Sequence, residues 1–306
     1  MSPFLKLIVS LPALLVLASC SGTNNTIKAD TGSDTNTVET EAAQVLRIAA
    51  AANLAGILPV VIEAYQAEVA HSKDGQNNDS QNTSDSKSKI EVTYASSGKL
   101  FAQINSGAPY DLFLSADQEF PAEYAQQQTI TKSTAQAPFT YARGQLALYS
   151  RNEDLSSIKT LDKTSLQQLF ITQPNASRST VKITLANPEL APYGASAKTF
   201  LQQQRIYDEL NDSKRLIQAE NIGQAFQYTH TATTDYGFVA LSQLISAKVE
   251  SSKYLVLQPE SYPAILQDGI VVSDHPKATD FSQYLQSEPA QKLFAESGYL
   301  PIANKP

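Results

Sequence analysis

Four short segments place small or polar residues where an extended pattern gives way to a helical one. They are Ala52-Asn53, Ser96-Ser97, Tyr193-Gly194 and Asn221-Ile222. At the start of a helix, the first backbone N–H groups have no partner within the helix, and the helix dipole favours negative charge. Any one segment alone is more typical of a helix cap, because Asn and Ser are common capping residues. Four of them in one chain favour a shared site for a small oxyanion.

The elements around these segments alternate between strand and helix patterns, which predicts an α/β protein with a parallel sheet. Gly107 is suited to end a short helix, and Pro59 fits a helix only in its first turn. The expected strands are 45–51, 90–94, "DLFLSAD", "VKITLANP" and "YGFVAL". The expected helices are 54–69, 98–106, 195–204, 222–229, one from Leu241, and two terminal helices broken at Pro289. In such sheets ligands bind beyond the carboxyl ends of the strands, where the four segments fall.

The N-terminus has the pattern of an exported protein. Lys6 precedes an apolar run from Leu7 to Leu17, which is too short for a comfortable membrane span and typical of a signal peptide. The run ends in "LASC", which resembles the cleavage box of bacterial lipoproteins. This resemblance implies that residues 1–19 are a signal peptide and that Cys20 carries lipid. Acyl chains, and not a spanning helix, would then hold the protein to a membrane.

Two further segments lack the apolar residues needed for a core. Residues 20–44 are polar and predict a flexible tether. Residues 72–89 contain no apolar residue and predict a disordered surface insertion.

The bulk composition describes an ordinary globular protein. The chain has 306 residues, a length that suits two domains, and 42% of them are hydrophobic. A net charge of −7 argues against nucleic acid or an anionic membrane surface as the main partner. Cys20 is the only cysteine, so the mature chain has no internal disulfide.

Several segments together resemble the molybdate-binding receptors of bacterial ABC importers. They are "RIAAAANL", "YASSGKL", "SGAPYDLFLSAD", "PYGASAK", "AENIGQAF" and "YGFVALSQL". The resemblance covers about residues 46–302 apart from the 72–89 insertion. It implies the fold of a type II periplasmic binding protein, in which two α/β lobes with mostly parallel sheets are joined by crossing strands and an oxyanion binds in the cleft.

The resemblance also implies a set of ligand contacts. Asn53 and Ser97 would bind the anion through side chain and backbone, Ile222 through its backbone amide, and Ala52 through a further amide. Tyr193 would use either its amide or its phenol. Many members of the family have Ser at the position of Asn53, Ala at that of Tyr193 and Tyr at that of Ala240. The chain is therefore similar to the branch of the family in which the ligand contacts are an Asn at the position of Asn53 and a Tyr at the position of Tyr193.

Such a site selects anions by their protons and their size. Molybdate and tungstate carry no proton near neutral pH and need only hydrogen-bond donors, whereas hydrogenphosphate also needs an acceptor for its own proton. A shell of amides and hydroxyls would leave that proton unpaired and disfavour phosphate. Sulfate would be disfavoured by its shorter bonds, which leave some donors out of reach.

The resemblance further implies the organisation of the protein and its partners. The first lobe is expected over 45–137 plus 273–306 and the second over 138–272, with "FTYARGQLALYS" and "YPAILQDGIVV" as crossing segments. The protein would be a periplasmic, membrane-anchored monomer. It would deliver its ligand to an ABC permease and its ATPase, and would need no cofactor and no metal other than that of the bound oxyanion.

Two alternatives stay open from the residues. The first is a receptor for another oxyanion, such as sulfate or phosphate. The second is a hydrolase that uses the Ser96-x-x-Lys99 spacing found in penicillin-recognising enzymes. The same spacing occurs at Ser84–Lys87, Ser86–Lys89 and Ser156–Lys159, and no Lys-Thr-Gly or Ser-Asp-Asn partner motif is present. The sequence therefore predicts a binding protein and not an enzyme.

Overall fold

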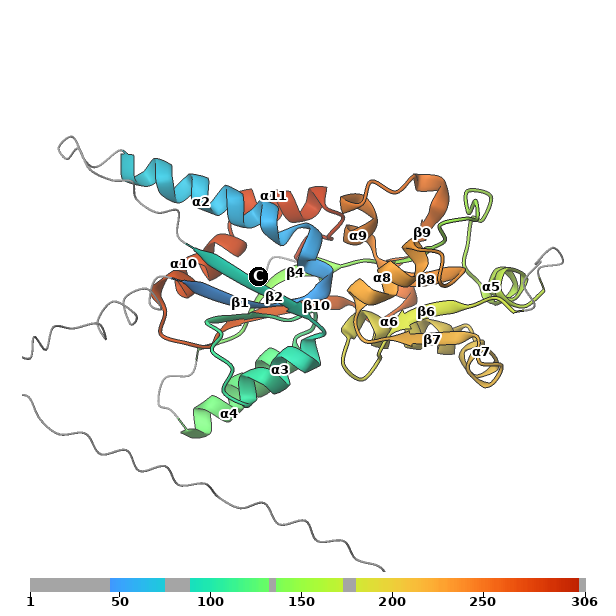
Figure 1. Ribbon diagram of the computed structural model, residues 1–306, viewed down its shortest axis with the longest axis horizontal. Helices are drawn as coiled ribbons and strands as arrows, with labels where there is room; N and C mark the ends of the chain where they lie inside the picture. Colours follow the sequence, from blue (N-terminus) through green and yellow to red (C-terminus); the bar gives the residue numbers. More distant parts are fainter. Residues whose placement is uncertain (1–44, 75–88, 132–135, 173–179, 303–306) are drawn as a thin grey trace, which may run out of the picture.

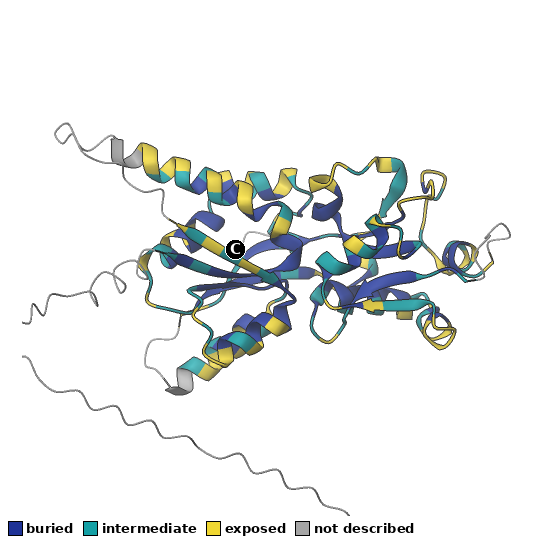
Figure 2. Cartoon of the chain, in the orientation of Figure 1, coloured by how far each residue is buried: buried dark blue, intermediate teal, exposed yellow. Residues whose placement is uncertain are grey.

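The computed structural model describes residues 45–74, 89–131, 136–172 and 180–302. They form two lobes, each built on one five-stranded sheet with helices on its faces (Figure 1). The central strands of each sheet are buried between helices whose outer faces are exposed (Figure 2). This architecture confirms the two-lobed α/β fold that the sequence predicts.

The first sheet has the strand order β2-β1-β3-β10-β4. β1 (Leu46–Ala51) pairs in parallel with β2 (Ile90–Ala95) and β3 (Leu112–Leu114). β10 (Ile265–Val271) is antiparallel both to β3 and to β4 (Phe139–Gly144). Four of the five strands therefore run in one direction, as expected for a mostly parallel sheet.

Both faces of the first sheet are covered, and its strands alternate accordingly. Along β1 and β3, Ile48 and Leu112 pack with α2 (Leu58–Asp74), α10 (Pro276–Leu285) and α11 (Glu288–Glu296). Ala49 and Phe113 face the opposite side and pack with α3 (Ser97–Asn105) and α4 (Glu119–Thr131). This period of two is the pleat of a strand that is buried on both faces.

The second sheet repeats the same arrangement with the order β7-β6-β8-β5-β9. β6 (Ile183–Ala186) pairs in parallel with β7 (Leu216–Ala219) and β8 (Tyr236–Ala240). β5 (Leu146–Tyr149) is antiparallel to β8 and to β9 (Tyr254–Val256). The α-helices of this lobe are α5 (Lys163–Phe170), α6 (Pro192–Gln203), α7 (Tyr207–Asp212), α8 (Ile222–His230) and α9 (Leu241–Ser246). Three short 3₁₀ helices complete the described chain: η1 (Ala52–Gly56), η2 (Ser251–Lys253) and η3 (Pro259–Ser261).

The strand pairing corrects the lobe boundaries expected from the sequence. β4 and β10 lie within the range 138–272 assigned to the second lobe, yet both belong to the first sheet. β10 pairs with β3, and β4 pairs with β10, so both strands extend the first sheet. No local pattern in the sequence shows which sheet a strand joins. The chain crosses to the second sheet at Gln145, between β4 and β5, and returns between β9 and β10.

Several helix boundaries also differ from expectation. The helix expected from Leu54 begins as η1, and α2 starts at Leu58, with Pro59 in its first turn as predicted. α2 reaches Asp74, inside the segment 72–89, whose residues 75–88 lie outside the described residues. The terminal helices separate at 286–287, and Pro289 lies in the first turn of α11 because proline suits that position.

Two predicted features of single residues are settled by backbone geometry. Gly107 follows α3 with a φ of +86°, so it ends this helix in the left-handed conformation that glycine adopts most readily. α6 begins at Pro192, three residues before the predicted start, which places Tyr193 in its first turn. The signal peptide and the tether, which includes Cys20, lie outside the described residues.

Candidate anion-binding site

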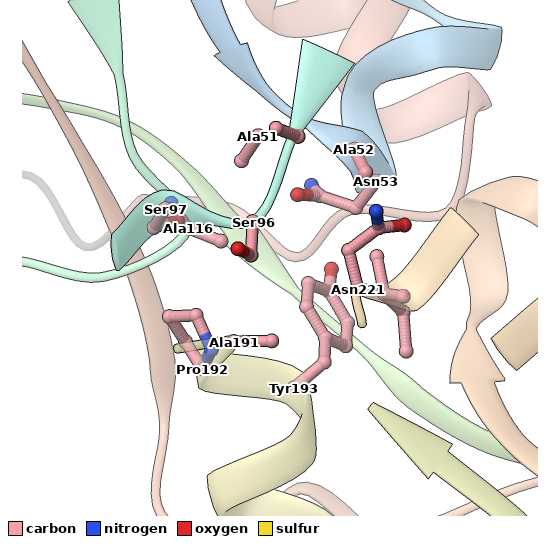
Figure 3. Close-up of a pocket in the computed structure, with 12 residues that line it drawn as sticks. Ala51, Ala52, Asn53, Ser96, Ser97, Ala116, Ala191, Pro192, Tyr193 and Asn221 are labelled. Atoms are coloured by element: carbon pink, nitrogen blue, oxygen red, sulfur yellow. Dashed lines mark hydrogen bonds between the residues drawn. The ribbon is translucent and has the colours of Figure 1, made fainter. Parts of the chain in front are cut away.

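A pocket lies between the two lobes at the carboxyl ends of the parallel strands (Figure 3). The space within it, counted together with the open solvent at its mouth, is about 200 Å³. The lining residues are Ala51, Ala52, Asn53, Ala95, Ser96, Ser97, Ala116, Ala191, Pro192, Tyr193, Asn221 and Ile222. All five ligand contacts predicted from the sequence are in this set, so the structure brings them together.

Three α-helices begin at the pocket. Ser97 and Ile222 are the first residues of α3 and α8, and Tyr193 is the second residue of α6. N–H groups at these positions have no partner within their own helix, and the helix dipoles add positive potential. Among the twelve lining residues, all of which the structure describes, none has a charged side chain. The pocket therefore favours an anion without neutralising it by a lysine or arginine.

The two serines of the first lobe differ in their bonding. Ser97 Oγ accepts a hydrogen bond of 3.0 Å from the backbone N of Ala116, and its own proton stays available. Ser96 is the N-cap residue of α3, but its side chain makes no capping bond. Ser96 Oγ is buried and has no hydrogen-bond partner among the described residues. The sequence predicts Ser96 only as part of the Ser96-Ser97 junction, and its role as a lining hydroxyl is visible only in the structure.

Asn53 is almost fully buried beside the serines. Its Nδ2 donates to Gln267 Oε1 and to the Tyr299 hydroxyl, both at 3.0 Å. Its Oδ1 has no hydrogen-bond partner in the described chain, and the amide oxygen points toward Ser96 (Figure 3). Leaving a buried carbonyl oxygen without a hydrogen bond costs free energy. The bonds of Nδ2 to Gln267 and Tyr299 therefore hold the side chain in this orientation.

Tyr193 crosses the pocket from the second lobe, with its hydroxyl near Asn53 (Figure 3). The phenolic oxygen accepts a bond of 3.1 Å from Gln267 Nε2. A Cβ atom at Gly144 would lie only 2.1 Å from this oxygen, so glycine is required there for close approach. Burial raises the pKa of Tyr193 well above its usual value, and the phenol is therefore a neutral donor at physiological pH.

The second lobe contributes a cap and a backbone amide. Asn221 Oδ1 accepts a bond of 3.0 Å from the backbone N of Gln224, so its side chain caps α8. Gln243 Nε2 donates to the Ile222 carbonyl at 3.0 Å, and its Oε1 accepts from the Ala240 N at 3.1 Å. These bonds hold the start of α8 against β8 and fix the Ile222 amide at the pocket.

Comparison with known proteins gives the family. The model of the bacterial extracellular solute-binding proteins matches residues 46–300, which is nearly all of the described chain. The chain belongs to this family. Its fold is that of a type II periplasmic binding protein, as the sequence resemblance implies.

Three individual proteins show how far this solute-binding protein resembles known ones. The molybdate-binding protein ModA of Rhodobacter capsulatus is 30% identical over 218 residues, 68% of this chain and 77% of its own length. The solved Azotobacter vinelandii periplasmic molybdate-binding protein has a TM-score of 0.68 at 25% identity, covering 84% of this chain and 99% of its own. YvgL of Bacillus subtilis, named as an ABC transporter substrate-binding lipoprotein, is 25% identical over 95% of this chain and 96% of its own.

Two contacts join the lobes of the solute-binding protein beside the pocket. The Gly98 N donates to the Leu190 carbonyl at 3.0 Å, which joins α3 to the loop before α6. At the rim, Lys99 Nζ lies 2.5 Å from Glu220 Oε1, and both side chains are about half exposed. The pocket is therefore enclosed by both lobes.

The structure offers no support for a serine–lysine hydrolase. Lys99 Nζ pairs with Glu220, and Ser96 Oγ has no partner among the described residues, so these two side chains form no nucleophile–base pair. Within the described ranges, no group of three or more His, Cys, Asp and Glu residues is placed to hold a metal ion. None of the helices that could be searched is both long and apolar enough to cross a membrane.

Proposed function

We propose that this protein is the solute receptor of an ABC importer and that it captures molybdate between its lobes. The observation that carries the proposal is the pocket itself, where three helix N-termini and neutral hydroxyls converge without a charged side chain. Such a shell binds an anion through donors only, which suits an oxyanion that carries no proton. The similarity to proteins named as molybdate-binding supports this ligand.

The proposed contacts follow the geometry of the two lobes. Asn53 and Ser97 would bind through side chain and backbone, and Ala52 and Ile222 through backbone amides. Tyr193 would bind through its amide or its phenol. Tungstate would be bound in the same way, because it is also a tetrahedral oxyanion without a proton at neutral pH. No cofactor is needed for this binding.

The N-terminus supports a lipid-anchored receptor in the periplasm. Cys20 would carry the lipid, and residues 20–44 would tether the lobes to the membrane at a reach of roughly 25–30 Å. The likeness to a protein named as a substrate-binding lipoprotein, which covers 95% of this chain, supports the anchor. The monomeric receptor would deliver its ligand to a molybdate permease and its ATPase.

A receptor for a protonated oxyanion such as hydrogenphosphate is favoured by one observation. The unpaired Oδ1 of Asn53 is a hydrogen-bond acceptor at the pocket, and an anion with a proton could donate to it. This alternative predicts a different anion preference, so one experiment separates the two proposals.

The experiment is a thermal-shift panel with molybdate, tungstate, sulfate and phosphate on the protein without residues 1–20, with an extrinsic dye because the chain has no Trp. A ligand at a thousand times its Kd should stabilise the protein by about 4 kcal/mol. For lobes of this size that corresponds to a rise in Tm of roughly 8–16 °C. Sodium chloride at matched ionic strength is the control.

The anions that raise the Tm in this panel identify the ligand class of the pocket. A shift with molybdate and tungstate alone supports the proposal. A shift with phosphate or sulfate instead would assign a different oxyanion to the pocket. If none of the four anions raises the Tm, the proposed function is wrong.

A further inference from the structure

Gln267 is a buried amide that touches both lobes at the pocket, although it is not one of the twelve lining residues. It lies in β10 at 0% exposure, and the register of β10 against β4 shifts between Gln267 and Asp268. Irregularities of this kind re-aim a side chain out of the regular pleat. Gln267 Oε1 faces Asn53 of the first lobe, and Gln267 Nε2 faces Tyr193 of the second.

The observed orientation leaves two conflicts inside this network. Asn53 Oδ1 is unpaired, as described above. The Tyr141 hydroxyl lies 2.7 Å from the Ser115 carbonyl and 3.2 Å from Gln267 Oε1, but it has one proton and can donate to only one of these oxygens. Burial raises the pKa of Tyr141 well above its usual value, so the hydroxyl is neutral and keeps that proton.

Turning both side-chain amides by 180° resolves the two conflicts together. Gln267 Nε2 then donates to Asn53 Oδ1 and to the Tyr141 oxygen, while Tyr141 donates to the Ser115 carbonyl. Gln267 Oε1 then accepts the phenolic proton of Tyr193. Asn53 Nδ2 becomes free and replaces the unpaired oxygen as the group directed at the pocket.

We infer that Gln267 is a positioning residue that couples the side chains of Asn53 and Tyr193. When an unprotonated oxyanion binds, Gln267 holds Asn53 with its NH₂ group toward the anion and takes the phenolic proton of Tyr193. Tyr193 then reaches the anion through its backbone amide. This inference rests on the proposed function, and it names the group that sets the selection against protonated anions.

The coupling follows from the count of protons. With the amides as observed, Tyr193 can donate its phenolic proton to a ligand, but Asn53 presents an acceptor. With the amides turned, Asn53 donates and Tyr193 does not. As long as both side chains keep their bonds to Gln267, only one of them donates to the ligand. An anion without protons selects the second arrangement, and a protonated anion selects the first.

A double-mutant cycle tests this coupling, with molybdate affinity measured by calorimetry. The variants are Asn53→Ala, Tyr193→Phe and the pair, each made with Gln267 and with Gln267→Met. With Gln267 present, Tyr193→Phe should weaken binding only through Asn53, so the pair should lose about as much affinity as Asn53→Ala alone. With Gln267→Met, the two fold-losses should multiply, because each side chain then acts independently.

The outcomes of the cycle separate the inference from the proposed function. Fold-losses that multiply even when Gln267 is present would overturn the inference. A wild-type protein that does not bind molybdate would instead overturn the proposed function. The Tm of each variant without anion shows whether it is folded.

A second variant keeps the inference testable if Gln267→Met does not fold. In Gln267→Glu, the protonated carboxyl keeps an acceptor for Tyr193 and one donor proton for Asn53, although the amide has two such protons, and the ionised carboxylate has only acceptors. Burial should raise the pKa of this carboxyl strongly, and the carboxylates of Asp117 and Asp268 near the Tyr141 hydroxyl should raise it further. Molybdate affinity should therefore fall at least tenfold between pH 6.5 and pH 9, relative to wild type.

The window from pH 6.5 to pH 9 lies between the shifted pKa values of the acidic and phenolic groups around Asn53 and Tyr141. Burial raises the pKa of Asp117 to about 6, below the window, and raises that of Tyr299 to about 12, above it. The pKa values of Tyr141 and Tyr193 are also raised. Gln291→Glu is the matched control, because the Gln291 amide is partly buried in the same lobe and bonds only to the carbonyls of Tyr141 and Leu285. A profile for Gln267→Glu that matches this control would overturn the inference.

Discussion

The two lobes have the same sheet order but supply different chemistry to the pocket. β1 and β6 hold the same place in their sheets, and so do β2 and β7. Asn53 follows β1, Tyr193 follows β6, Ser97 follows β2 and Ile222 follows β7. Equivalent strand ends therefore meet across the pocket and aim helix N-termini at it from both sides.

The difference lies in what is left available at each strand end. In the first lobe, the hydroxyls of Ser96 and Ser97 keep their protons free for a ligand. In the second lobe, Asn221 is used as a cap and Ile222 has no polar side chain. The first lobe thus offers free serine hydroxyls, whereas the second offers the Tyr193 phenol, which is bonded to Gln267, and the backbone amides at the starts of α6 and α8, of which α8 is capped by Asn221. The shared topology places the anion, and the first lobe is the half in which substitutions can alter selectivity.

The sharpest test of this difference compares Ser97→Ala with Ile222→Val. Ser97→Ala should weaken molybdate binding by about 1.5–3 kcal/mol, the usual value for a hydrogen bond to a charged group. It should also destabilise the fold by about 1–3 kcal/mol, because the Ala116 N–H loses its acceptor. Ile222→Val keeps the backbone amide and should leave the affinity unchanged. Calorimetry and thermal melts measure the two effects separately.

Ser106→Ala is the matched control for this comparison. Ser106 follows the last turn of the same helix, and its exposed hydroxyl bonds only to the Ala102 carbonyl. Its affinity for molybdate should equal that of wild type. If Ser97→Ala bound molybdate as tightly as wild type, or if Ile222→Val lost much affinity, the first lobe would not bind through the Ser97 side chain or the second through the Ile222 backbone.

How much of the site could be predicted depended on how local its signals are. The strand-end positions of Asn53 and Asn221 look equivalent in the sequence, and both were noted. The cap at Asn221 is a local feature that the sequence predicts, and the structure confirms it. Only the structure shows that Asn53 is an under-satisfied amide, because its partners Gln267 and Tyr299 come from distant elements. Gln267 gave no signal at all, since its partners Asn53 and Tyr193 are 214 and 74 positions away.

The fold was predictable in kind but not in its boundaries. The strands β1, β2, β3, β6 and β8 follow from local apolar patterns and were all expected. The placement of β4 and β10 in the first sheet depends on pairing between strands more than 100 residues apart, such as Ile265 with Gly144. Local patterns contain no information about such a choice.

Two aspartates at the starts of helices should respond to pH with opposite signs. Asp117 accepts from the Phe120 N at the start of α4 in the first lobe, and burial raises its pKa to about 6. Its stabilising contribution is therefore full below about pH 4 and is lost as the pH rises through 6. Asp162 caps α5 in the second lobe, and bonds from Ser165 lower its pKa. Its contribution is present above about pH 4 and is lost as the pH falls through the lowered pKa.

The corresponding variants are Asp117→Asn and Asp162→Asn, both of which keep an oxygen for the cap. At pH 7, Asp117→Asn should be more stable than wild type by at most about 3 kcal/mol, and the gain should vanish near pH 4. Asp162→Asn should be slightly less stable at pH 7 and should approach wild type in acid. Thermal melts from pH 8 down to about pH 2 check both, because the change for Asp162 lies below its ordinary pKa. If stability changed with the same sign in both variants, the opposite pKa shifts of the buried Asp117 and the exposed Asp162 would be contradicted.

The smallest expected effect concerns the ion pair that joins the lobes at the rim. Lys99 and Glu220 lie 2.5 Å apart, but both are about half exposed, so solvent screens their attraction. Lys99→Ala should weaken molybdate binding by at most about 1 kcal/mol. The loss should disappear near 1 M salt, where the screening length falls to about 3 Å.

The salt dependence of molybdate affinity therefore separates the contribution of the rim ion pair from that of the buried Ser97 hydroxyl. The loss caused by Ser97→Ala should persist at high salt, because that hydroxyl is buried between the lobes. Small-angle scattering of Lys99→Ala with molybdate should still show compaction, since the backbone bond from Gly98 to Leu190 also joins the lobes. If Lys99→Ala abolished compaction, the ion pair would be required for closure, and the buried contacts would not be sufficient to hold the two lobes together.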